Sequence, residues 1–503
     1  MDSFLLYEDS TTEGKKRYFS PGDIVKDLNL DIIFRTMSSG DEWIFHRIKK
    51  VVLIPLKTPK EVQYRHQATE DFQNYPKLLH TMYDCARKQE KALQIYKTEM
   101  DRNRMRSTRK TGEILETLNY LQSAHSELLL LRDLLKEYRE KCHSQALINL
   151  SMRLEEMSLD EIAGKLQELD YFVSGGKIGY TLQFGAGMKI RDIVVRYSEH
   201  QERTKKKRQG NLDKLYYTFF KKNSIPLREE ELQRDVSHVK EEVLSYLLRL
   251  FWPYRDELIH FWEYFAEEMA FYYGSVHLMN RLKELSLPLT MPDPKPMGTR
   301  DTHYEDLYEL SMAIYVQKRP IGNRLSIKDN LILLITGANQ GGKSTFLRSF
   351  GIAQVLMQCG MAVPAAYFSA PLRPQIFTHF TRREDEQLNS GRLREELKRM
   401  SAMVDAAVSD SLFLLNESFA STTEKEGTQI AKDILQAFYE KGITTYMVTH
   451  LFLLAEALYE KKMPGITFLT AERKADGKKT YHMLEGKPEH TSYGMDLFGE
   501  LEI

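Results

Sequence analysis

Residues 331–348, LILLITGANQGGKSTFLR, decide the fold class of the C-terminal part of the chain. The first six residues predict a buried strand. They run into GANQGGKS (337–344), which fits G-x-x-x-x-G-K-[S/T], and a helix-favouring run follows. In such a turn small glycines let successive backbone N–H groups point inward at a helix N-terminus, where they bind phosphate oxygens. The stretch predicts a phosphate-binding loop; the alternative is a glycine turn without a ligand.

The residue types of this loop indicate ATP and Mg²⁺ as cofactors. Lys343 supplies a compact positive charge to the outer phosphates, and the Ser344 hydroxyl is a ligand for Mg²⁺. The residues predicted here to bind the nucleotide are Gly337, Gly341, Gly342, Lys343, Ser344 and Thr345.

Two further apolar runs, SLFLLN (411–416) and TTYMVT (444–449), predict buried parallel strands with helices between them, which is α/β architecture. A polar residue follows each run. Glu417 is placed to orient or deprotonate an attacking water, and His450 to reach the terminal phosphate. Either residue alone is a weak signal, because strand ends are often only surface. The order of phosphate loop, acid and histidine suggests an ABC-type ATPase head.

The region before this domain is predicted to be mostly helical. Residues 1–85 are mixed, and VVLIPL (51–56) is typical of a buried strand or extended segment. Within residues 86–298, apolar residues from Ile114 to Tyr138 recur at three- and four-residue steps, which predicts a long helix with one packed face. The proline-rich end of this region predicts a boundary with an ATPase domain at 299–503. The predicted fold class is mixed, with a mostly α-helical core and lever followed by an α/β P-loop domain.

A small hairpin is predicted at 177–199, where the apolar period changes to two. The run from Arg203 to Lys222 then holds eight Lys or Arg and one acid, with aromatic residues between them. Two interpretations of this run have equal support. It is either a patch that contacts phosphates, or a solvated helix face whose aromatic residues pack in the core. The candidate nucleic-acid contacts, within a possible clamp near 177–225, are Arg203, Lys205, Lys206, Lys207 and Arg208.

Composition excludes several classes of protein. The chain has 503 residues, 28% charged and 42% hydrophobic, which fits a folded, helix-rich protein of two to four domains. A formal net charge of +0 provides no global basic field, so any nucleic-acid contact must be local. Three cysteines without a CxxC pair predict neither a disulfide framework nor a zinc site. We find no signal peptide and no membrane-spanning run, so we expect a cytoplasmic protein.

Several segments resemble the DNA mismatch-repair MutS family. LLITGANQGGKSTFLR (333–348) resembles its ATPase motif, and NESFASTTEKEG (416–427) resembles its acidic strand and D-loop. The likeness is strong in the C-terminal part and diffuse before residue 300. The other similar segments are QCGMAVPAAYF (358–368), THL (449–451), YHMLEGKPEHTSYGMDL (481–497) and, upstream, DLNLDIIF (27–34) and PKEVQYRHQATEDFQNYP (59–76).

The resemblance implies a homodimer. Two ATPase heads would sandwich two nucleotides, each site would be completed by the opposite subunit, and helical levers would connect the heads to a clamp around mismatched or branched DNA. By position, Asn339 lies in the phosphate loop near the terminal phosphate, Glu417 is the catalytic carboxylate and His450 senses that phosphate. Ser421 and Thr422 lie in the D-loop and face the partner.

Asn416 departs from the family, which has aspartate there. Its amide oxygen still accepts a hydrogen bond from Ser344 or from a magnesium-bound water, so both residues are predicted at the metal. Because the amide brings no negative charge, we expect a slow ATPase with weak magnesium affinity.

The segment LNSGRLREEL (388–397) also departs, with Leu393 and Arg394 where the family commonly has a Ser-Thr pair. Ser390 and Gly391 are predicted to aim backbone N–H groups at a phosphate of the partner's site; the alternative is an ordinary capped helix start. We expect neither the family's mismatch-reading domain before residue 27 nor its helix-turn-helix after 492–494, which argues against direct reading of a mismatch.

The leading hypothesis is a MutS-related ATPase that clamps DNA in repair. The second is a MutS-like ATPase acting on ribosomes or structured RNA, as some relatives without the mismatch domain do. The third is a nucleotide-gated scaffold with little turnover.

Overall fold

The computed structural model describes residues 4–8, 15–103, 109–173, 178–184, 190–197, 244–338, 340–381, 391–473 and 479–488. The chain divides into two compact units. The first comprises residues 85–136 and 152–263, and the second comprises residues 2–84, 137–151 and 264–503. The division predicted at residue 298 stays a prediction.

Long helices form most of the first unit. The predicted apolar stripe of the helix over Ile114–Tyr138 is confirmed, because its residues are buried along α6. The predicted hairpin is confirmed as well, since β1 and β2 pair antiparallel. The elements with residues in this unit are α5 (Pro76–Asn103), α6 (Arg109–Tyr138), α7 (Gln145–Glu156), α8 (Leu159–Val173), β1 (Ile178–Phe184), β2 (Ile190–Tyr197) and α11 (Trp252–Glu284).

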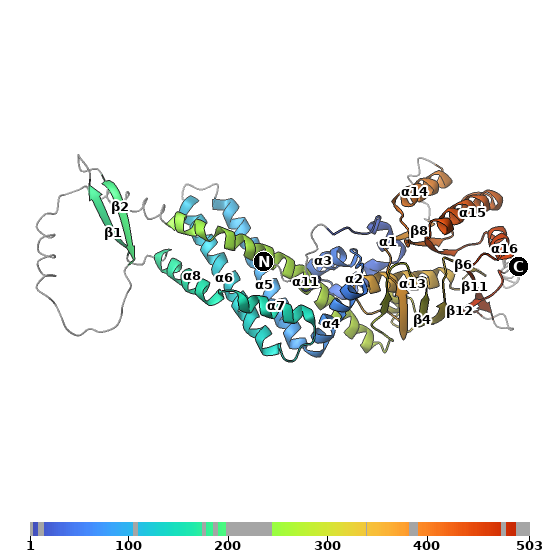
Figure 1. Cartoon of the computed structure of the whole chain (residues 1–503), viewed down its shortest axis with the longest axis horizontal. Helices are drawn as coiled ribbons and strands as arrows, with labels where there is room; N and C mark the ends of the chain where they lie inside the picture. The colour runs from blue at the N-terminus through green and yellow to red at the C-terminus, as the bar shows by residue number, and fades with distance from the viewer. Residues whose placement is uncertain are drawn as a thin grey trace, which may run out of the picture. The chain divides into compact units, whose positions relative to one another are not determined.

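A six-stranded sheet forms the centre of the second unit (Figure 1). Its order is β12-β11-β6-β10-β9-β8, and every pair is parallel except β11 with β12. The three parallel strands predicted from the apolar runs are therefore confirmed. The strands are β6 (Ile332–Thr336), β8 (Ile376–Phe380), β9 (Leu412–Asn416), β10 (Thr444–Val448), β11 (Ile466–Arg473) and β12 (Lys479–Glu485).

Helices cover both faces of this sheet, which is why its central strands are continuous apolar runs. On one face α14 (Arg392–Ala406), α15 (Glu424–Glu440) and α16 (Phe452–Lys461) share an apolar core with the strands (Figure 1). Phe413 of β9 belongs to that core and lies 4.3 Å from Phe438 of α15 between ring centroids. On the other face, Phe350 of α13 (Lys343–Gln358) lies 4.6 Å from Tyr446 of β10.

A second sheet packs on the far side of α13. Its order is β3-β7-β4-β5, formed by β3 (Asp293–Lys295), β4 (Thr302–Leu307), β5 (Asn323–Ile327) and β7 (Tyr367–Pro371), and α12 (Leu310–Val316) follows β4. The ring of Tyr304 in β4 lies 6.1 Å from that of Phe350. The helix that follows the predicted phosphate loop is therefore held between two sheets.

The N-terminal helices belong to this second unit as well. They are α1 (Pro21–Asp27), α2 (Leu30–Ser38), α3 (Glu42–Val52) and α4 (Pro59–Asn74). Arg348 of α13 donates to the Asp27 carbonyl at 3.0 Å. Within VVLIPL, α3 continues to Val52 and the remaining buried residues form no strand, so the strand interpretation of this segment was wrong and its burial was correct.

Residues 4–8 are bound to α4 and α11. Glu268 accepts hydrogen bonds from the backbone N–H groups of Leu5 and Leu6 at 2.7 and 3.1 Å. Arg65, fully buried, donates to the Leu6 carbonyl at 3.0 Å and to the Cys359 carbonyl at 2.8 Å. Because Cys359 is the C-cap of α13, Arg65 joins this N-terminal segment to the end of α13. None of the helices in the described ranges is both long and apolar enough to cross a membrane.

Candidate functional site

The glycines of the predicted phosphate loop are required by its shape. Gly337 has φ of 118° and Gly342, the N-cap of α13, has φ of 90°. A Cβ on Gly337 would lie 2.9 Å from the Ala471 backbone nitrogen, and a Cβ on Gly341 would lie 2.9 Å from the Ala471 Cβ. Any larger residue would push the loop away from β11, so the glycines serve close packing as well as backbone freedom.

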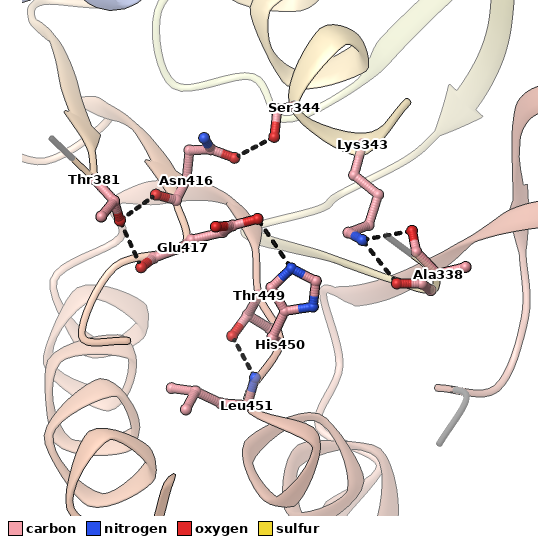
Figure 2. Close-up of polar contacts among 10 residues, drawn as sticks. Ala338, Lys343, Ser344, Thr381, Asn416, Glu417, Thr449, His450 and Leu451 are labelled. Atoms are coloured by element: carbon pink, nitrogen blue, oxygen red, sulfur yellow. Dashed lines mark hydrogen bonds and ion pairs between the residues drawn. The ribbon is translucent and has the colours of Figure 1, made fainter. Parts of the chain in front are cut away.

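The ammonium group of Lys343 is held by backbone carbonyl groups of the loop (Figure 2). Its Nζ donates to the Gly337 and Ala338 carbonyls at 2.7 and 2.8 Å, and the side chain is buried. Burial lowers the pKa of this ammonium, while the nearby Glu417 carboxylate acts in the opposite direction. The loop therefore holds a cation at a fixed place beside a helix N-terminus, where an anion is favoured.

Ser344 and Asn416 are in direct contact, as predicted for the metal residues. The Ser344 hydroxyl donates to the Asn416 Oδ1 at 2.8 Å (Figure 2). Both side chains present oxygen atoms, the ligand type that Mg²⁺ prefers. Among the described residues there is no group of three or more His, Cys, Asp or Glu that could hold a metal. This donor set fits an ion that binds one or two protein oxygens and takes its other ligands from phosphates and water.

Glu417 and His450 meet at the ends of adjacent strands. The His450 Nε2 donates to Glu417 Oε1 at 2.9 Å, and both side chains are about one-third exposed, at 33% and 37% (Figure 2). This hydrogen bond lowers the pKa of the Glu417 carboxyl, against burial, which raises it. The Glu417 carboxyl is therefore held as a carboxylate that solvent reaches, the form that a general base needs.

Thr381 was missed by the sequence analysis. It follows β8, and its hydroxyl lies 3.2 Å from the Asn416 carbonyl oxygen and 2.8 Å from that of Glu417 (Figure 2). No local pattern marks such a threonine, because its contact exists only when β8 and β9 lie side by side.

A pocket of about 500 Å³ opens beside these residues. One side is made by residues 340–346 of the loop and by Glu417. The rest of the lining was also missed from sequence and comes mostly from β4, α12, the segment before β5, β5 and β12. Its apolar wall is formed by Leu307, Met312, Pro320, Ile321 and Tyr481, and Glu309, Arg319 and Asn323 line the pocket as well. An apolar wall opposite a phosphate loop suits a flat base at one end of a ligand and phosphates at the other.

The remaining predicted residues have mixed outcomes. Thr345 lines the pocket. Ser421 donates to Glu396 at 2.6 Å, and Gly391 is the exposed N-cap of α14, so within this chain neither joins the cluster around Lys343. Outside the described residues lie Asn339, Ser390, Arg203, Lys205, Lys206, Lys207 and Arg208.

Two family models match the chain. The model of MutS domain V matches residues 333–500, which include the phosphate loop, Asn416, Glu417 and His450. The model of the MutS2 N-terminal domain matches residues 57–285. Between them the two models match parts of both the helical region and the α/β region.

Curated relatives agree with these matches. Human MutS protein homolog 4 is 29% identical over 190 residues, 35% of this chain and 20% of the relative. The DNA mismatch repair protein MutS of Thermus aquaticus is 31% identical over 177 residues, 35% of this chain and 22% of the relative. MutS of Macrococcus caseolyticus is 22% identical over 487 residues, 90% of this chain and 56% of the relative. The matched part thus spans between about a fifth and about half of these relatives, and by these matches the chain is related to MutS proteins.

Proposed function

We propose that this chain binds and hydrolyses ATP. The observation that carries the proposal is that Lys343, Ser344 and Glu417 line one pocket, although they come from separate strand ends. Asn416 and His450 join this cluster through their hydrogen bonds to Ser344 and Glu417. A phosphate chain on the loop would contact successive N–H groups and the Lys343 ammonium. The apolar wall around Ile321 and Tyr481 would receive the base.

Each side chain has a distinct role in the proposed reaction. Ser344 and Asn416 would hold Mg²⁺, which when bound neutralises charge on the phosphates. Glu417 orients the attacking water and accepts its proton. His450 holds the Glu417 carboxylate in place through its Nε2–H and would sense the terminal phosphate. Because Asn416 contributes no negative charge, turnover is slow and the need for Mg²⁺ is high.

Steady-state ATP hydrolysis tests this proposal. Glu417→Gln removes the proton acceptor and should lower kcat by about 100-fold or more, the contribution typical of a positioned base. Glu460→Gln changes an exposed glutamate of α16 in the same way and should leave kcat unchanged. Equal rates for wild type and Glu417→Gln at saturating Mg²⁺ would remove hydrolysis from the proposal and leave the nucleotide-gated scaffold, which retains ATP and a protein partner without turnover.

We further propose that two copies assemble with composite sites. The segment containing Ser390 and Gly391, together with Ser421, would face the partner's nucleotide, since the two described residues, Gly391 and Ser421, do not join their own chain's cluster. Support comes from the relationship to MutS proteins. ATP-dependent dimerisation, measured by light scattering with Glu417→Gln to prevent turnover, tests this arrangement.

DNA in a mismatched or branched form is the proposed partner. The relatives named as mismatch repair proteins support it. The basic run 203–208 is the candidate contact, and neutralising Lys205, Lys206 and Lys207 together should weaken DNA binding and reduce its salt dependence by up to about three counterions. Unchanged affinity and salt slope would exclude the run.

Structured RNA or the ribosome is the second candidate partner. Nucleic acid that copurifies with the protein from cells distinguishes the two: ribosomal RNA in stoichiometric amount favours the second candidate, and DNA favours the first.

A further inference from the structure

The turn that follows β9 has an unfavourable backbone. Glu417 has φ of 56° and Phe419 has φ of 66°, both in the left-handed region that residues with a side chain rarely adopt. Such conformations persist only where the surroundings hold them, and they often occur at functional sites. The turn from Asn416 to Ser421 therefore needs fixed contacts to keep the Glu417 carboxylate in place.

Contacts from neighbouring strands hold the first half of this turn. The Glu417 N–H donates to the Val448 carbonyl at 2.9 Å, and the Thr381 hydroxyl donates to the Glu417 carbonyl at 2.8 Å. The Ser418 hydroxyl lies 2.7 Å from the His379 Nδ1. These three partners belong to β8, β10 or the residue that follows β8.

The second half of the turn is held by one helix residue, Glu396. Its side chain, 9% exposed, comes from the first half of α14. Its Oε1 accepts from the Phe419 N–H at 3.2 Å, and its Oε2 accepts from the Ser421 hydroxyl at 2.6 Å. Hydrogen bonds to an ionised acceptor are roughly twice as strong as neutral ones, and here two of them converge on the turn.

We infer that Glu396 is a positioning residue for Glu417. It does not touch the pocket; it fixes the turn that carries the carboxylate and ties that turn to α14. Because α14 starts directly after the segment proposed to face the partner subunit, a shift of this helix on dimerisation would be transmitted through Glu396 to the turn. The expected effect of Glu396 on the rate of hydrolysis rests on the proposed ATPase function. Its expected effect on the order of the turn rests on geometry alone.

Kinetics of Glu396 variants test the inference. Glu396→Ala should lower the single-turnover rate of hydrolysis by about 10- to 100-fold, the effect of about one hydrogen bond to a charged group at the position of Glu417, with ATP affinity within about twofold of wild type. Glu396→Gln keeps the shape and one acceptor oxygen and should restore most of the rate. Ser421→Ala removes one of the two contacts and should give an intermediate rate. Ser401→Ala, at an exposed position on the same helix, is the matched control.

Hydrogen exchange separates failure of this inference from failure of the proposed function. In Glu396→Ala, amides of residues 417–421 should exchange faster than in wild type, whereas Ser401→Ala should leave them unchanged. Unchanged exchange and unchanged turnover in Glu396→Ala would overturn the inference, and so would a loss of ATP affinity equal to the loss of rate. A wild-type protein without any turnover refutes the ATPase proposal, while the exchange result still decides whether Glu396 holds the turn.

Discussion

Substituting Asn416 by aspartate should strengthen the use of Mg²⁺. The Ser344 hydroxyl donates to Asn416 Oδ1 at 2.8 Å, so an aspartate would keep this contact and add a negative charge beside the proposed metal. A net neutral hydrogen bond contributes about 1 kcal/mol and one to a charged group about 1.5–3 kcal/mol, which leaves a gain of about 0.5–2 kcal/mol. At 1.4 kcal/mol per factor of ten, this gain lowers the Mg²⁺ concentration that the reaction requires by roughly 2- to 30-fold.

The assay is ATP hydrolysis against Mg²⁺ concentration. Asn416→Asp should reach half-maximal rate at a roughly 2- to 30-fold lower Mg²⁺ concentration than wild type. Asn74→Asp adds the same charge at an exposed position at the end of α4 and should not shift the curve. An unshifted or right-shifted curve for Asn416→Asp would refute the reasoning that the missing charge limits metal binding.

Three other changes have expected outcomes. Gly337→Ala should destabilise the fold by on the order of 1–3 kcal/mol and weaken ATP binding, because φ is 118° and the new Cβ would lie 2.9 Å from the Ala471 nitrogen. Thermal unfolding without and with ATP measures the two effects. Equal unfolding temperatures for variant and wild type under both conditions would contradict the prediction. Burial lowers the pKa of His66 and of His379 to about 4, whereas an unfolded histidine has a pKa of about 6.5. Between these two pH values both side chains stay neutral in the folded state. In this pH range the unfolded chain binds more protons than the folded one, so the free energy of unfolding should fall by up to about 3 kcal/mol per histidine from about pH 6.5 to pH 4. A free energy of unfolding that stays constant over this range would show that these two sites are not desolvated. Glu268→Ala should cost about 2–4 kcal/mol in urea unfolding, because it leaves two buried backbone N–H groups unpaired, and a cost below about 0.5 kcal/mol would mean that residues 4–8 are not held as described.

The core of the site was predictable because its signals are local. The loop GANQGGKS carries its own turn, charge and hydroxyl, and each five-residue apolar strand delivers Glu417 or His450 at its end. Parallel strands bring their C-terminal ends to one edge of a sheet, so the meeting of these residues follows from the fold class.

Other parts depend on contacts distant in sequence. Thr381 reaches Asn416 only because β8 lies next to β9, and Tyr481 reaches the loop only through the order of β12 and β11. Leu5 pairs with Glu268 across 263 residues, a separation at which no periodicity gives a signal. VVLIPL is a short apolar run, and such a run has no periodicity that separates a helix end from a strand. Its first two residues end α3, and the other four are neither helix nor strand.

Equilibrium binding of ATP in the presence of Mg²⁺ to wild type and Lys343→Ala tests the central claim most directly. The buried Lys343 ammonium is the fixed cation of the loop, so its loss should weaken ATP binding by about 10- to 100-fold. Lys398→Ala, which removes an exposed lysine of α14, should bind ATP as wild type does. ATP binding that is absent from wild type, or equal in wild type and Lys343→Ala, would contradict the account.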